Sequence, residues 1–108
     1  MEIYLLTATT ISQTNEVDVN TLAFKEYADA VAEMKCKILD DLHNISSYRQ
    51  MDIYEQEEFV KRLLSGSSES LKYGYDISYD PTTLTYIRTC LYNNIFCQLF
   101  IEKTVVKM

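Results

Sequence analysis

The feature that most constrains the fold is a change in hydrophobic period, which occurs twice along the chain. Before about residue 25 and after about residue 70, apolar and polar residues alternate as they do in strands, whereas between these points they recur every three or four residues, as in helices. Only two glycines and one proline occur in 108 residues, which leaves little room for long irregular loops. The pattern predicts a single α+β domain over residues 1–108.

The first part of the chain predicts a β-hairpin. Residues 2–11 are rich in β-forming side chains, a polar break follows at 12–15, and alternation resumes from Val17 to Ala23. An alternative interpretation begins a helix at Asn20 or Thr21, because both residue types are good helix N-caps.

The middle of the chain predicts two helices. The first follows a helical period from Phe24 to Ile45, and Glu33 and Lys37 on its outer face have the spacing of a favourable ion pair. Residues 43–50 interrupt this pattern.

The second helix has signals at both ends. Asp52 followed by Glu55 is a capping-box arrangement, which predicts a helix start. Gly66 lies where a left-handed residue commonly ends a helix, so we expect the helix to stop at Ser65–Gly66.

The last third of the chain predicts a three-stranded meander, preceded by a flexible linker at 65–70. A turn is expected at Pro81 and a two-residue turn at Asn93–Asn94. The predicted strands are 70–80, 84–92 and 95–106. The full order is therefore β-β-α-α-β-β-β, an antiparallel sheet with two helices packed on one face.

Tyrosine is over-represented, with nine tyrosines and no tryptophan. Tyrosine combines apolar area with a hydroxyl, so it suits positions that are half buried or part of an interface. Three interpretations of the aromatic face stay open: packing against the helices, a homodimer interface, and stacking of a nucleotide with the arginine as phosphate partner. We favour packing, because the opposite side of the strand at 70–80 is too polar to be core. The aromatic face comprises Tyr73, Tyr75, Tyr79, Tyr86 and Arg88.

The charge balance restricts the partners. Ten basic and 16 acidic residues give a formal net charge of −6, which disfavours direct contact with nucleic acid through a basic patch. An acidic surface can instead occupy a basic groove that normally holds nucleic acid, so we expect a protein partner with a basic surface. Two solvated amphipathic helices are the simpler alternative. The carboxylates predicted to form this surface are Glu26, Asp29, Glu33, Asp40, Asp41, Glu55, Glu57 and Glu58.

Catalytic and metal-binding patterns are missing from the sequence. The lone His43 follows Asp40 and Asp41 at the end of the first helix, where an imidazole can interact with terminal carbonyls. There is no glycine-rich phosphate loop and no spacing of metal ligands. We therefore expect no enzymatic activity, no metal and no cofactor.

The compartment is suggested by the cysteines and by apolar run length. Cys36, Cys90 and Cys97 follow no C-x-x-C spacing, which fits a reducing environment. The first ten residues do not read as a signal peptide, and no apolar run reaches the roughly 18 residues that a membrane span needs. We expect a cytoplasmic protein that does not bind membranes.

The opening M-E-I-Y-L-L-T-A-T-T and the helical stretch F-K-E-Y-A-D-A-V-A-E-M, together with small size and negative charge, resemble small acidic proteins of phages and mobile elements. That group includes anti-CRISPR and other anti-defence inhibitors. The resemblance implies a non-enzymatic DNA mimic, present in the host cell cytoplasm, that blocks a nucleic-acid-handling complex such as a CRISPR effector. The alternatives are a small-ligand or nucleotide-binding protein that uses the aromatic face, and a structural homodimer.

Overall fold

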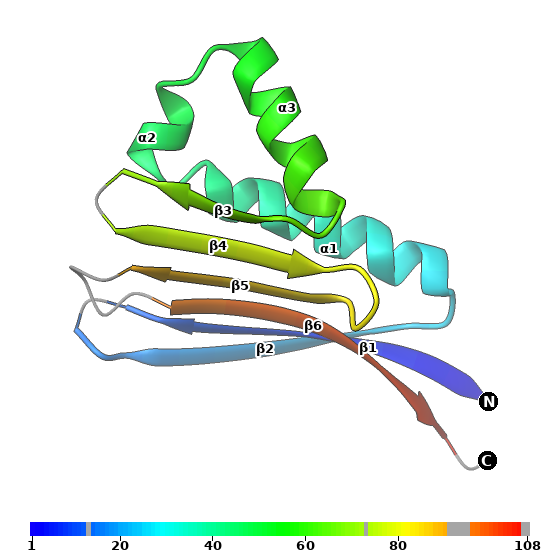
Figure 1. The fold of residues 1–108 in the computed structure, drawn as a ribbon. Coiled ribbons are helices and arrows are strands. Elements are labelled where there is room, and N and C mark those ends of the chain that lie inside the picture. Colours follow the sequence, from blue (N-terminus) through cyan, green and yellow to red (C-terminus); the bar gives the residue numbers. More distant parts are fainter. Residues whose placement is uncertain (13, 73, 91–95, 107–108) are drawn as a thin grey trace.

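A computed structural model describes residues 1–12, 14–72, 74–90 and 96–106. Six strands form one antiparallel sheet in the order β2-β1-β6-β5-β4-β3, and the three helices lie on one side of it (Figure 1). The strands are β1 (Glu2–Ile11), β2 (Val17–Phe24), β3 (Ser68–Leu71), β4 (Tyr75–Asp80), β5 (Thr85–Cys90) and β6 (Phe96–Val105). The helices are α1 (Tyr27–Leu42), α2 (Ser46–Arg49) and α3 (Ile53–Leu64). The predicted α+β class and antiparallel sheet are confirmed.

The N-terminal hairpin has the predicted form. β1 pairs with β2 from Tyr4 opposite Phe24 to Ile11 opposite Val17. The alternative helix start at Asn20 or Thr21 is wrong, because both residues lie inside β2.

The predicted order lacked one short helix and one strand. α2 lies within 43–50, where only a break in the pattern was expected, and β3 begins within 65–70, where a flexible linker was expected. Both elements have four residues, so they are too short to show a hydrophobic period of their own.

The prediction of one strand over 70–80 is wrong. The chain reverses at Gly74, whose φ of 78° is left-handed, and Leu71 then lies opposite Tyr75. Residues opposite each other in an antiparallel pair point to the same face of the sheet. The alternating pattern therefore continues through the hairpin, and the sequence does not reveal the turn. The predicted turn at Asn93–Asn94 lies outside the described residues.

Both predicted ends of α3 are confirmed. The Asp52 side chain accepts a hydrogen bond from the Glu55 N–H at 2.8 Å and caps the first turn. At the other end Gly66 has a φ of 104°, and its N–H donates to the Leu63 carbonyl at 3.0 Å. The Ser67 N–H reaches the Arg62 carbonyl at 3.3 Å, which completes a Schellman motif.

The core lies between the sheet and the helices. Its members come from one side of the sheet and from the inward side of each helix, including Leu6, Ile77, Tyr86 and Leu99 from strands and Met34, Ile38, Leu42, Tyr48, Phe59 and Leu63 from helices. The opposite side of the sheet has no helix over it in Figure 1, and we call it the uncovered face. Strand register places on this face the apolar residues Ile3, Leu5, Ile11, Val17, Val19, Ile87, Phe96 and Phe100.

Candidate functional site

The predicted aromatic face is mostly buried beneath the helices. Tyr86 has no exposed surface, and Tyr79 and Arg88 are also buried. Tyr75 is half-buried against the core, with its ring centroid 5.9 Å from Arg88 Cζ. An exposed aromatic row that stacks a nucleotide is therefore wrong for Tyr79, Tyr86 and Arg88, whose positions are those of packing residues. Tyr73 lies outside the described residues.

Asp41 is not part of an acidic surface, and that prediction is wrong. The residue lies on the inward side of α1 and is 8% exposed. Its Oδ2 accepts hydrogen bonds from Tyr86 Oη at 2.6 Å and Arg88 Nε at 2.7 Å, and its Oδ1 accepts from Arg88 Nη2 at 2.7 Å. A buried carboxylate is tolerated here because a bidentate guanidinium and a hydroxyl satisfy it.

The sequence contained a signal for this cluster that was not used. Asp41 follows Met34 and Ile38 at helical spacings of seven and three, which places it on the apolar stripe of α1. Arg88 lies two residues from Tyr86, so both share one face of β5. A charged residue on a buried face indicates that it needs a counter-charge, although the pattern does not say which residue supplies it.

The pKa values around Asp41 follow from burial and from its charge. Burial, and then the carboxylate of Asp41, raises the pKa of Tyr86 far above its ordinary value. The same two causes raise the pKa of Cys97 to about 12. For Arg88, burial alone would lower the pKa, but the hydrogen bonds and charge of Asp41 outweigh it and raise the pKa. The cluster thus holds one ion pair and a neutral tyrosine, closed from solvent, and its role is to join α1 to β5.

Of the remaining predicted carboxylates, Glu26 lies directly before α1 and the others lie on α1 and α3, and they are accessible to different degrees. Glu33 is half-buried and forms the predicted pair with Lys37, at 3.9 Å. Glu58 is also half-buried, and the exposed members are Glu26, Asp29, Asp40, Glu55 and Glu57. Glu58 and the five exposed carboxylates form no ion pair with any residue that the structure describes.

These carboxylates are not gathered at one place. Asp29 precedes Leu39 by ten residues, which is about 15 Å along the axis of α1. Glu26 lies further in the same direction. Of the predicted acidic set, Glu57 lines the surface described next, and Asp40 is the chain neighbour of Leu39, which also lines it.

A shallow apolar depression of about 470 Å³ lies where α1, α2 and α3 meet, and we call it the α1–α3 depression. Ile53 and Tyr54, in the first turn of α3, are 75% and 71% exposed, more than any other large apolar side chain of the described chain. Leu39, next to Asp40, is exposed on α1. The lining residues are Leu39, Tyr48, Ile53, Gln56, Glu57, Val60 and Lys61.

The α1–α3 depression was missed by sequence reasoning, although α3 carries a signal for it. Phe59 and Leu63, four residues apart, form the inward stripe of this helix. Ile53 and Val60, seven residues apart, lie on a second stripe beside it, where Val60 is half-buried against the core and Ile53 is exposed. A second apolar stripe on an otherwise charged helix predicts a surface that another molecule can cover.

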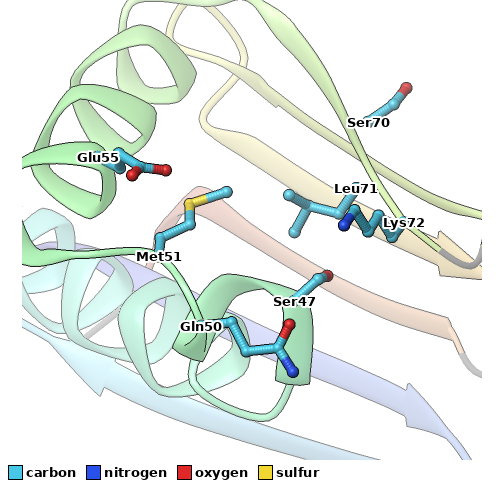
Figure 2. A pocket seen from close by; sticks show the side chains of 7 residues that line it. All are labelled: Ser47, Gln50, Met51, Glu55, Ser70, Leu71 and Lys72. Carbon is cyan, nitrogen blue, oxygen red and sulfur yellow. The ribbon is translucent and has the colours of Figure 1, made fainter.

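A second pocket, of about 370 Å³, lies between α2, α3 and β3 (Figure 2). Met51 and Leu71 reach into it from opposite sides, and its charged groups are Glu55 and Lys72. The Ser47 hydroxyl on its wall is buried and makes no hydrogen bond within the described residues. No group of three or more His, Cys, Asp or Glu side chains able to hold a metal ion is found in the described part of the chain.

His43 lies directly after α1, where a structural role was expected. Its Nδ1 is 2.7 Å from the Leu39 carbonyl oxygen, and its ring meets the Tyr48 ring edge-on at 5.3 Å. The imidazole therefore occupies the C-terminal end of the helix.

Comparisons with protein-family models, with curated proteins and with solved structures find no match to this chain. Among the described residues, no helix has both the length and the apolar character needed to cross a bilayer.

Proposed function

We propose that the protein is a non-enzymatic binding protein that inhibits a larger partner by covering a basic surface, such as the nucleic-acid groove of a CRISPR effector or another defence complex. The observation that carries this proposal is the exposure of Ile53 and Tyr54 at an apolar depression whose charged lining residues are Glu57 and Lys61. Exposed apolar groups of this size are unusual on a surface that only meets water.

The apolar and acidic groups have different tasks in the proposed complex. Apolar anchors at the centre of an interface supply most of the affinity, and burial of one such side chain is worth about 1.5–3 kcal/mol. Asp40 and Glu57 at the border orient the partner and speed its approach when the partner is basic. A lysine- or arginine-rich groove with an apolar side chain at its centre would match this arrangement.

The net charge supports the proposed DNA mimicry. A chain with a formal net charge of −6 is attracted over long distances to the same groove that attracts a phosphate backbone. Binding of this kind weakens as salt rises, because mobile ions screen the attraction.

The test is binding of the purified chain to a panel of purified CRISPR effectors and other basic nucleases, at low and physiological salt, with nucleic acid as competitor. The pair of reversals Asp40→Lys and Glu57→Lys should lower the association rate by about tenfold or more. Ile53→Ser should mainly raise the dissociation rate.

The matched control is the pair Glu16→Lys and Asp18→Lys, which changes the net charge equally but lies at the β1–β2 turn and the start of β2. It should alter the association rate much less. Equal effects of the two pairs would mean that total charge, and not the α1–α3 depression, directs binding. Absence of binding to every member of the panel at low salt would contradict the proposed function.

A further inference from the structure

The part of the uncovered face that strands β2, β1, β6 and β5 form has almost no charge. Strands β2, β1, β6 and β5 lie side by side, and no helix lies over this side of them (Figure 1). Of the residues that register places on this face from those four strands, Glu102 alone is charged. The acidic residues Asp76 and Asp80 appear only on the next strand, β4.

A face that meets only water would carry a different composition. Antiparallel sheets with one solvated side show polar and charged residues on that side. This chain has 26 charged residues in 108, yet the face carries isoleucine, valine, phenylalanine and threonine. Many of the charged side chains therefore lie on the helices, and few of them lie on this face.

The size of the face is that of a protein interface. Four strands spaced about 4.8 Å apart and about eight residues long give a flat footprint of about 500 Å² per copy, before the relief of the side chains is counted. The chain's accessible surface of 6924 Å² is larger than the value of about 6,200 Å² for a compact monomer of 12.6 kDa, as expected when one side of the sheet is uncovered. Two such faces together bury about 1,000 Å² or more, the lower limit for a specific interface.

One bulky side chain of the face has small neighbours on both adjacent strands. Phe100 on β6 lies between Thr7 of β1 and Thr85 of β5 in the strand register. Phe100 is thus flanked on both sides by small side chains, which leaves it prominent on the face. In a stack of two sheets, such a side chain can pack against a threonine of the other copy.

We propose that the uncovered face is the interface of a homodimer, in which two sheets stack face to face about 10 Å apart with the helices outside. A second copy fits because a chain of net charge −6 repels its copies elsewhere but meets them here with a nearly neutral surface. A basic partner would find a single carboxylate, Glu102, to pair with on these four strands. The dimer leaves the α1–α3 depression open on both copies, so this inference does not depend on the proposed function.

The test is the molecular mass of the full chain in solution, measured by sedimentation equilibrium across the micromolar range. We expect a reversible dimer of twice 12.6 kDa. Phe100→Glu places two carboxylates at the centre of the interface and should weaken dimerisation by at least about tenfold. Thr9→Arg adds charge to the same face without removing an apolar side chain, so it keeps the test decisive should Phe100→Glu fail to fold.

Asn20→Glu is the matched control, because this exposed residue of β2 points to the other side of the sheet. It should leave the dimer intact, as should Glu57→Lys on α3. A wild-type mass of one chain throughout the range would overturn the proposal. So would a dimer that survives both Phe100→Glu and Thr9→Arg in folded protein, since that result would indicate pairing through the exposed edge of β2.

Discussion

The two faces of the sheet are built from alternate residues of the same strands, yet they have opposite character. On β5, Tyr86 and Arg88 are enclosed by helices and bonded to Asp41, while Ile87 between them faces away from the helices. One face therefore combines a buried ion pair with tight packing, and the other presents on four of its strands an apolar and threonine-rich surface with no helix over it. The comparison teaches that the fold of one chain is completed on the first face, whereas the second is the interface of the proposed dimer.

The largest effect is expected from breaking the buried ion pair. Asp41→Asn leaves the Arg88 guanidinium buried without its counter-charge and should lower the free energy of unfolding by about 3–5 kcal/mol. Urea denaturation with circular dichroism measures this loss. The triple variant Asp41→Leu/Tyr86→Phe/Arg88→Met removes every polar group of the cluster and should regain most of it. A triple variant as unstable as Asp41→Asn would show that shape, and not charge, is decisive.

A matched pair of isoleucines compares the two faces directly. Ile77 on β4 is buried beneath the helices, whereas Ile87 on β5 lies on the uncovered face. Ile77→Ala should cost about 2–5 kcal/mol of unfolding free energy, because it opens a cavity in the core. Ile87→Ala should cost below about 1 kcal/mol at concentrations low enough to keep the chain monomeric. If chemical denaturation gave the same loss of unfolding free energy for Ile77→Ala and Ile87→Ala, the two faces would not differ in their contribution to the stability of the single chain.

Alkaline pH should destabilise the packing between the sheet and the helices, where Cys97 and Tyr86 are buried. The thiol of Cys97 ionises near 9.0 in the unfolded chain, but burial first, and then the charge of Asp41, raises its native pKa to about 12. The pKa of Tyr86 is raised above its ordinary value of 10.0 for the same reasons. The unfolded chain therefore loses these protons first, and stability is complete below pH 9 and falls above it.

Each group contributes at most about 1.4 kcal/mol per pH unit to this decline. Thermal melting between pH 7 and pH 11 measures it. In Cys97→Ala the decline should begin about one pH unit later, because the remaining groups with raised pKa values on this side are the tyrosines Tyr48, Tyr79 and Tyr86, whose ordinary pKa is 10.0. A melting temperature that stays constant to pH 11 would contradict the burial of both groups.

The smallest predicted effect concerns the Ser47 hydroxyl. Unlike the Asp41 carboxylate, which accepts three hydrogen bonds, it has no hydrogen-bond partner among the described residues. The buried Ser47 hydroxyl makes no hydrogen bond within the described residues, so Ser47→Ala should stabilise the chain by about 1 kcal/mol. Ser46→Ala, at the exposed neighbouring position, should change the unfolding free energy by less than about 0.5 kcal/mol. Destabilisation by Ser47→Ala would mean that the hydroxyl is satisfied, for example by water in the pocket of Figure 2.

Local signals in the sequence predicted the elements that depend on local energetics. The Asp52 cap, the left-handed Gly66 and the first hairpin each follow from a few neighbouring residues, and all three are confirmed. The hairpin at Gly74 was missed because opposite residues share a face, so the alternating pattern crosses the turn without a change.

The long-range features needed the tertiary structure. Asp41 and Arg88 are 47 residues apart, and the spacing of neither residue names the other as partner. The α1–α3 depression joins side chains of three helices, and no single helix shows that they converge.

The sequence by itself determined the class of the fold, because hydrophobic period and capping residues act over one or two turns of chain. It also determined the negative charge and hence the kind of partner that can be expected. Only the tertiary structure decided which carboxylate is buried, which stay exposed, and which side of the sheet the helices cover. These choices depend on how elements distant in sequence pack together, and desolvation then gives identical side chains different roles.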